Sequence, residues 1–508
     1  MFVISFLKRY FFLILISLVL TTRFLYLDFG LPLVFQADEV EMVEYSLKYS
    51  VNIRKIFEGD FYFFKPFSFV YGSLPAYFNT ILLVPFLKFT SVFDLSQDRF
   101  FIYLYLRSIY ALLSIFACIG VYFLALELAK NNKKIAYIAA LLFSLNYYFY
   151  WLSKYLNNDV LVVLFTVYFL LFYLKFKREG NEKYFYLAML FLGFGIATKV
   201  TFAIGAIYPI LDFLLKKNFK KIFISIGILF LVYLLTNPFT LIYPNEFIQR
   251  ILEMRIKENG IVIDSYNTSY FKYLFSLTYL ITIPVTIFAL FYISKKLIKK
   301  ELDITIFISL FYIIFFSFSS RLVDRWLMPI FPLLIIYALI FLDSLKLKYL
   351  KTLIVIAIFI EVVFKFLLTN LELTYNANLL NAFYTFRNAH SNEFKNVYVL
   401  TERGLNPFNS LKRTNLGIDS QQFVPYVSEN AFGIPPLDVN LYDYVVYSSK
   451  VRSYFLNPYI YNLDSSFVDT WENSYKTLNS EDFELLYSFE TPFDSIINQE
   501  NIYIYRKK

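Results

Sequence analysis

Cysteine and histidine are nearly absent from this 508-residue chain, and each absence excludes a class of site. The one cysteine, Cys118, lies within an apolar run, so no intrachain disulfide is encoded and the redox compartment cannot be inferred. With one histidine, His390, a metal site rich in histidine or cysteine is excluded. A divalent metal held by carboxylates alone stays open, but no motif indicates one, and we expect no resident cofactor.

The chain also lacks an internal repeat, a low-complexity tract and the charge pattern of a nucleic-acid-binding protein. Its net charge is +9, but the lysines cluster in short loops between apolar runs. In such loops basic residues determine membrane topology. We therefore expect membrane lipid, and no nucleic acid, among the partners.

Long hydrophobic runs dominate what is present: 58% of the residues are hydrophobic, and the mean hydropathy is +0.54. Many runs reach the roughly 18 residues that a helix needs to cross a bilayer, which predicts a polytopic membrane protein. The first run follows "FLKRY" and precedes no small-residue cleavage site, so we expect a retained anchor. The runs lie near 10–27, 71–90, 100–128, 135–152, 160–174, 184–197, 200–215, 222–236, 273–293, 303–319, 326–343 and 352–369.

Basic clusters between these runs predict the topology. If 71–90 crossed the membrane, the N-terminal "LKR" would lie opposite the later lysine clusters, against the positive-inside rule. We therefore expect 71–90, which contains Pro75 and Pro85, to lie along the surface. About eleven transmembrane helices remain, with the N-terminus cytoplasmic and the C-terminus external. Lysine clusters on both sides of 184–215 predict two short spans with a turn near Thr198-Lys199.

The expected fold is thus an all-α polytopic membrane domain, 1–370, followed by an external soluble α/β domain, 371–508. Residues 28–99 form a large first external loop with interfacial helices. In the C-terminal domain the apolar runs become short, which is typical of strands. We predict strands at 396–400, 442–449, 483–489 and 501–506.

Polar residues collect in the loops that this topology places outside. The stretch "VFQADEVEMVEYSLKYS" puts an adjacent acid pair, Asp38 and Glu39, just after the first span. A carboxylate near the membrane surface can accept a proton from an attacking hydroxyl. Basic groups at the same level can hold a phosphate. The other candidates in these loops are Lys154, Asp159, Lys199, Arg321 and Arg325.

Each candidate also has a structural explanation. The acid pair could favour a helix dipole, and Asp159 could cap a helix. Lys199 could extend to the interface from a short hairpin, and Arg321 with Arg325, beside Asp324, could be an interfacial anchor. Taken singly, each residue is therefore compatible with a catalytic or binding role and with a structural role.

The order of the motifs carries more information. "ADEVEMVEYS" follows one span, and "RSIYALLSIFACIGVYFLALELAKNNKKIAYIAALLFSLNYYFYWLSKYLNND" holds the next two spans with their loop. "LFLGFGIATKVTF", "TNPFTLIYPNEF" and "RWLMPIFPLL" come later. In this order the chain resembles the protein mannosyltransferase-like glycosyltransferases of the GT-C fold. That superfamily includes protein O-mannosyltransferases and the aminoarabinose transferases of lipid A.

The resemblance implies an inverting transfer of sugar from a polyprenyl-phosphate monosaccharide to a hydroxyl acceptor, at the outer face of the cytoplasmic membrane. It implies that Asp38 is the general base, that Glu39 orients it or organises the loop, and that Asp159 supports the acceptor side. The acceptor could be a protein, a lipid or a glycan, and we carry over no metal site. The implied donor-phosphate residues are Lys199, Arg325, Lys154 and Arg321.

Two other functions stay open. A transporter or lipid-linked sugar flippase would place charged or broken helices near the bilayer midplane, often in inverted repeats. Here the charges concentrate at one face, which disfavours that class. A non-catalytic scaffold for envelope glycan assembly is the second alternative.

Overall fold

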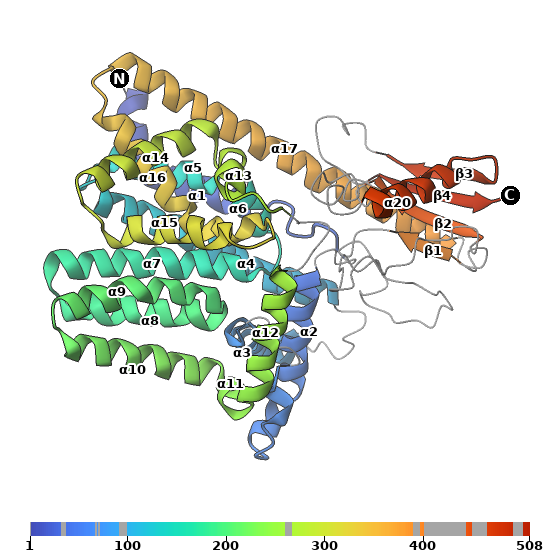
Figure 1. Ribbon diagram of the computed structural model, residues 1–508, viewed down its shortest axis with the longest axis horizontal. Coiled ribbons are helices and arrows are strands. Elements are labelled where there is room, and N and C mark those ends of the chain that lie inside the picture. The colour runs from blue at the N-terminus through green and yellow to red at the C-terminus, as the bar shows by residue number, and fades with distance from the viewer. Residues whose placement is uncertain are drawn as a thin grey trace.

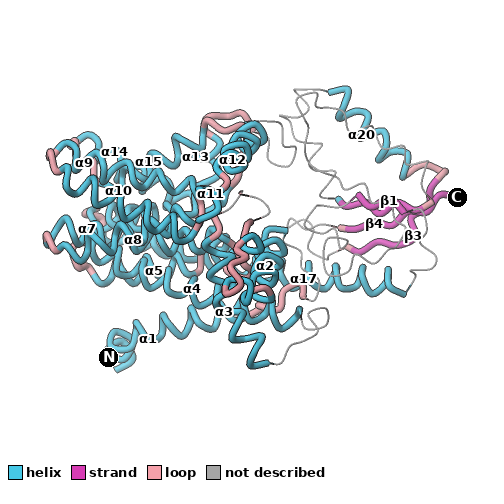
Figure 2. Tube along the Cα trace, turned by 90° about the horizontal axis from the view of Figure 1, so that it is seen from below, coloured by secondary structure: helices cyan, strands magenta, loops and turns pink. Residues whose placement is uncertain are grey.

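The computed structural model describes residues 2–31, 37–66, 69, 72–90, 99–259, 267–389, 397–400, 443–449, 465–490 and 501–508. Figure 1 shows a helical bundle, a small sheet beyond one end of it, and one long helix that connects them. The N-terminus and C-terminus lie at opposite ends of the molecule (Figure 2).

Helices form in every apolar run that the sequence predicts. Among the described residues, five helical stretches are long and apolar enough to cross a membrane: Phe100–Leu128, Asn158–Glu179, Phe219–Thr236, Asp324–Ser344 and Tyr349–Thr374. Other predicted spans are shorter or are divided into two helices. The bundle comprises α1 (Phe2–Phe24), α4 (Arg99–Leu128), α5 (Lys133–Ser144), α6 (Tyr147–Leu152), α7 (Asn158–Glu179), α8 (Glu182–Thr198), α9 (Ile204–Leu215), α10 (Phe219–Thr236), α13 (Lys272–Leu280), α14 (Ile283–Ile298), α15 (Ile304–Ser317), α16 (Phe331–Ser344) and α17 (Lys348–Ala389).

Short polar segments divide this apolar sequence into helices. The Asn181 side chain caps α8 by accepting a hydrogen bond from the backbone N–H of Lys183. Gly180, with φ +70°, ends α7 in the left-handed conformation that glycine adopts without strain. The predicted turn near Thr198-Lys199 is confirmed: α8 ends at Thr198, and Lys199 is extended before a 3₁₀ turn, η3 (Val200–Ala203).

The two ends of the bundle differ in chemistry. Helices α7 and α8 run antiparallel, and so do α9 and α10 (Figure 1). Around the turns that follow α7 and α9, Lys177 and Lys216 pair with Asp212, and Lys221 pairs with Glu182. Asp159 and Lys199 lie at the other end, where α7 begins and α8 ends. For these helices the expected separation of basic turns from candidate site residues is present, and which end is cytoplasmic stays a prediction.

The first loop contributes helices that pack on the end of the bundle nearer the sheet. Helix α2 (Ala37–Val51) packs on α3 (Leu74–Thr90), where the Ser46 hydroxyl donates to the carbonyl oxygen of Ala76 at 3.4 Å. Helix α2 and helix α12 (Pro244–Asn259) lie across the direction of α7–α10 (Figure 1). The interfacial position of 71–90 stays a prediction. The remaining short elements here are η1 (Ile53–Ile56), η2 (Tyr62–Phe64), α11 (Pro238–Ile242) and η4 (Asp324–Ile330).

In the described residues of the C-terminal part, four strands form a sheet of order β1-β2-β4-β3. β1 pairs parallel with β2, and β4 pairs antiparallel with both β2 and β3. All four predicted strands are confirmed, as β1 (Val397–Leu400), β2 (Tyr444–Ser448), β3 (Phe483–Phe489) and β4 (Ile502–Lys507), together with helix α20 (Ser465–Leu478). Helix α17 runs without a break through the expected domain boundary at 370.

Candidate active site

The acid pair lies in the first turn of α2, and its two members face different surroundings. The Asp38 side chain is 31% exposed, whereas that of Glu39 is 0% exposed. Adjacent helical residues point about 100° apart, so one turn can present one acid to a site and bury the other. This difference separates two networks.

The buried network centres on Glu39 and Arg107. Arg107 Nε and Nη2 donate to the two carboxylate oxygens of Glu39 at 2.8 and 2.7 Å, a bidentate pair. Arg107 Nη1 donates to the carbonyl oxygens of Leu27 and Phe29. The Leu156 backbone N–H donates to Glu39 Oε1 at 3.1 Å. The pair therefore joins the segment after α1, the start of α2 and the segment before α7.

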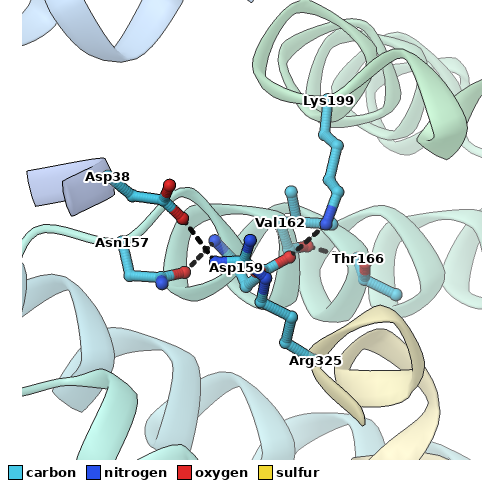
Figure 3. Close-up of polar contacts among 7 residues, drawn as sticks. All are labelled: Asp38, Asn157, Asp159, Val162, Thr166, Lys199 and Arg325. Atoms are coloured by element: carbon cyan, nitrogen blue, oxygen red, sulfur yellow. Dashed lines mark hydrogen bonds and ion pairs between the residues drawn. The ribbon is translucent and has the colours of Figure 1, made fainter. Parts of the chain in front are cut away.

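The partly exposed network alternates acids and bases (Figure 3). Arg325 Nη1 donates to Asp38 Oδ2 at 2.5 Å, and Arg325 Nε lies 3.8 Å from Asp159 Oδ2. The Lys199 ammonium donates to Asp159 Oδ1 at 2.7 Å. Four residues from α2, α7, the end of α8 and η4 thus form one chain of charges. We name it the four-charge cluster.

Local structure explains how each member is held. Asn157 caps α7, and its Oδ1 accepts from the Asp159 backbone N–H at 2.7 Å. Lys199 is the extended residue after α8, so its side chain leaves the helix at this point. Arg325 belongs to η4, the 3₁₀ turn that precedes the buried helix α16. Each charged group therefore lies at the end of a regular element, at one end of the bundle.

A second contact holds the Lys199 turn in place. The Gly72 N–H donates to the Thr198 carbonyl oxygen at 3.2 Å, and a Cβ at Gly72 would lie 1.6 Å from the carbonyl oxygen of Ala197. Buried Asn237 accepts from the Ser73 N–H at 2.5 Å and donates to the Ala197 carbonyl oxygen at 3.3 Å. The segment before α3 and the start of α11 therefore support Lys199.

Lys154 lies outside the four-charge cluster. Its buried ammonium donates to the carbonyl oxygens of Thr22, Arg23 and Leu25, at 2.6, 3.2 and 2.6 Å. These carbonyls belong to the C-terminal end of α1, where helices leave acceptors unpaired. We therefore assign Lys154 to capping α1 in place of the donor-phosphate role implied by the resemblance.

Arg321 lies four residues before Arg325, in the segment between α15 and η4. Its carbonyl oxygen accepts from the Tyr273 hydroxyl at 3.2 Å, and its N–H donates to the Ser319 hydroxyl at 3.1 Å. The neighbouring Asp324 accepts a hydrogen bond from the Ser276 hydroxyl. A phosphate role for Arg321 stays a prediction.

Within the part of the chain that the structure describes, no three histidine, cysteine, aspartate or glutamate side chains gather closely enough to hold a metal ion. The acids of the four-charge cluster face Arg325 and Lys199 instead. The arrangement thus offers one partly exposed carboxylate, at Asp38, paired with Arg325, and a second cation, Lys199, held by the buried acid Asp159.

Several supporting residues were missed in the sequence. Arg107 lies inside the run 100–128, and a charged residue within a span is usually paired or functional, a signal that could have singled it out. Asn157 directly precedes α7, where an N-cap is common. Gly72 and Asn237 carry no local signal for a contact between distant segments.

Comparison with known proteins shows which proteins this chain is similar to in sequence and in fold. Residues 78–242 match the family model described as dolichyl-phosphate-mannose-protein mannosyltransferase. The crystal structure of ArnT from Cupriavidus metallidurans bound to undecaprenyl phosphate matches with a TM-score of 0.54 and 14% identity, over 97% of this chain and 98% of that one. The chain has the GT-C fold.

Other matches agree with the GT-C assignment. The apo oligosaccharyltransferase of Archaeoglobus fulgidus matches with a TM-score of 0.53 and 12% identity, over 97% of this chain and 81% of that one. An uncharacterized protein of Aquifex aeolicus (strain VF5) is 26% identical over 282 residues, 54% of this chain and 56% of that protein. The match thus spans about half the length of that relative. The expected resemblance to protein mannosyltransferase-like GT-C proteins is confirmed.

The matches also limit what can be transferred. At these identities the solved structures establish the GT-C fold and not the substrate. The family model covers Arg107, Asp159 and Lys199 but includes neither Asp38 nor Arg325. The roles of individual residues therefore rest on the geometry of this chain.

Proposed function

We propose that this GT-C protein is an inverting membrane glycosyltransferase. It moves a monosaccharide from a polyprenyl phosphate to a hydroxyl group of a protein, lipid or glycan at the outer face of the cytoplasmic membrane. The observation that carries the proposal is the four-charge cluster. In it the partly exposed Asp38 pairs with Arg325, Arg325 lies near Asp159, and Asp159 pairs with Lys199. Under this proposal the N-terminus is cytoplasmic and the C-terminal domain is external.

In the proposed reaction Asp38 accepts the proton of the acceptor hydroxyl. The hydroxyl oxygen forms a bond to the anomeric carbon of the sugar, and the bond from that carbon to the phosphate oxygen breaks. The phosphate gains one negative charge as it leaves, while Asp38 loses one. The total charge of the site is therefore unchanged, and a preorganised cluster can stabilise the transition state without a large rearrangement.

Arg325 and Lys199 bind the phosphate in this proposal, since both already contact carboxylates that a phosphate can replace. A donor phosphate that binds Arg325 also weakens its contact with Asp38. The base is then free to accept a proton only when the donor is present. Asp159 holds Lys199, and Glu39 with Arg107 holds the segments that carry Asp38 and Asp159.

Transfer of radiolabelled sugar from polyprenyl-phosphate mannose, glucose and arabinose into endogenous membrane acceptors tests the proposal. We expect transfer by wild type from one of these donors, and loss of transfer by Asp38→Asn at matched expression. The labelled product then identifies the acceptor class. Equal transfer by wild type and Asp38→Asn would exclude Asp38 as the base. No transfer by wild type from any donor would favour the flippase or scaffold alternatives.

A further inference from the structure

Three aromatic side chains form a strip along α6 and the segment after it. Tyr148, Trp151 and Tyr155 are three and four residues apart, a spacing that places side chains on one helical face. The Tyr148 and Trp151 rings stack with centroids 6.0 Å apart and planes at 27°. The Trp151 and Tyr155 rings meet edge to face at 5.2 Å. We call these three residues the aromatic strip.

The aromatic strip lies beside the four-charge cluster. The Tyr148 hydroxyl lies within electrostatic range of Asp324, Arg325 and Asp159 and near the Arg325 backbone. Tyr155 lies within electrostatic range of Arg325, Asp38 and Asp159. Tyr148 therefore lies near the proposed phosphate-binding arginine, and Tyr155 lies near both that arginine and the proposed base.

Two rings of the strip, Tyr148 and Trp151, are more exposed than the core around them, whereas Tyr155 is buried. Phe149, Tyr150 and Leu152 of α6 are fully buried, as expected for rings and aliphatic groups that only pack. Tyr148 and Trp151 stay partly exposed at the end of the bundle that carries the charges. Tyr148 and Trp151 pack against the core on one side, and their partial exposure leaves ring surface that the core does not cover.

Sugar rings have the complementary chemistry. Their hydroxyl groups point outward around a ring whose faces carry C–H groups, so a flat aromatic surface can cover one face while charged groups bind the hydroxyls. In the donor the sugar is bonded directly to the phosphate. A phosphate held at Arg325 therefore places that sugar next to Tyr148.

We propose that Tyr148 and Trp151 bind the face of the donor sugar, with Tyr155 packed behind them. This inference rests on the proposed function and adds a sugar-binding subsite to it. The subsite selects the lipid that carries a monosaccharide over the same lipid without one. It therefore favours binding of the intact donor and release of the polyprenyl phosphate product.

The test is equilibrium binding of two tritiated lipids to the full-length protein: polyprenyl phosphate, and the polyprenyl-phosphate sugar that wild type uses or binds most tightly. We expect Trp151→Ala to weaken binding of the sugar-bearing lipid about tenfold and to leave the bare lipid unchanged. Trp151→Phe keeps a flat ring and should restore most of the affinity. Trp471→Ala, in α20, is the matched control, and both lipids should bind it as they bind wild type.

Equal affinity of Trp151→Ala and wild type for the sugar-bearing lipid would overturn the subsite. Equal loss for both lipids would overturn it too, because the effect would then concern the phosphate, the chain or the fold. Failure of the proposed function has a different signature: wild type would bind neither lipid, or would bind the sugar-bearing lipid without transferring its sugar. In that last case a selective loss in Trp151→Ala would still support the subsite.

A second readout uses the scarcity of tryptophan, since the chain has Trp151, Trp326 and Trp471 only. In a Trp326→Phe/Trp471→Phe background, emission reports on Trp151 alone. We expect the sugar-bearing lipid to change that emission and the bare lipid to leave it unchanged. Identical responses to both lipids would contradict direct contact between Trp151 and the sugar.

Discussion

Asp38 and Glu39 are neighbours in sequence, yet their ion pairs differ in almost every respect. The Glu39–Arg107 pair is nearly fully buried, is bidentate and gains further hydrogen bonds from three backbone groups. The Asp38–Arg325 pair is 31% exposed on both sides and has a second acid, Asp159, near its arginine. A buried, fully bonded carboxylate has little capacity left for a substrate, whereas a partly exposed one can exchange partners. The comparison therefore supports a structural role for Glu39 and the proposed catalytic role for Asp38.

The largest expected effect is on catalysis. Asp38→Asn keeps the size of the side chain and a hydrogen-bond acceptor for Arg325 but removes the base. We expect sugar transfer to fall by about 10²–10⁴-fold. The unfolding midpoint in detergent should stay close to that of wild type. Glu58→Gln, which changes an exposed acid of the same first loop, is the control and should keep full activity.

The buried pair should respond in the opposite way. Glu39→Gln leaves the Arg107 guanidinium buried without its carboxylate, which destabilises a protein by about 3–5 kcal/mol. Thermal unfolding of the purified protein measures this change. The double variant Glu39→Gln/Arg107→Gln should recover part of the loss, because no unpaired charge remains. A normal midpoint together with lost transfer in Glu39→Gln would reverse the assignments of the two acids.

Two lysines extend the comparison. Lys154→Met leaves carbonyl oxygens at the end of α1 without a donor and should reduce stability by about 1–3 kcal/mol. The folded fraction should keep its KM for the lipid donor. Lys199→Met should raise that KM instead, since Lys199 belongs to the four-charge cluster. Kinetics and unfolding measured on the same preparations separate the two; a raised KM in Lys154→Met would return this lysine to the phosphate site.

The smallest effect is expected at an ion pair of the protein surface. Lys65 donates to Glu246 at 2.7 Å and lies over the Tyr243 ring at 3.9 Å, which connects the first loop to α12. Exposed pairs contribute about 0–1 kcal/mol, so Lys65→Met should barely change the unfolding midpoint. If Lys65→Met lowered the unfolding midpoint as much as Glu39→Gln does, solvent exposure would not explain the difference in stability between these ion pairs.

Much of this architecture could be predicted from sequence because periodicity and turn residues act locally. The apolar runs, the break at Lys199 and the four strands all follow from short-range patterns. The predicted topology placed four charged loop residues on one face of the membrane, which is why they could be chosen as site candidates. The structure brings them together: Asp38, Asp159, Lys199 and Arg325.

Pairing between distant segments could not be predicted. Glu39 and Arg107 are 68 residues apart, and an apolar run does not reveal which acid its arginine will meet. Lys154 has the charge and the loop position expected of a phosphate ligand. Its partners are instead carbonyl groups 129–132 residues away in the sequence. Whether a lysine or arginine reaches the proposed site or caps a helix depends on how its helix is rotated and how deeply its side chain is buried. The sequence pattern determines neither.

Helix α17 gives the molecule a mechanical property. It continues from 375 to 389 beyond its apolar stretch, about 22 Å at 1.5 Å per residue. Because no hinge interrupts it there, a pull on the sheet domain becomes a tilt of the transmembrane segment. That segment bonds to α6, where the Tyr150 hydroxyl donates to Asn370 at 2.5 Å and the Tyr150 ring contacts Phe366. A force applied to the sheet would therefore be transmitted along α17 to α6, the helix that carries Tyr148 and Trp151.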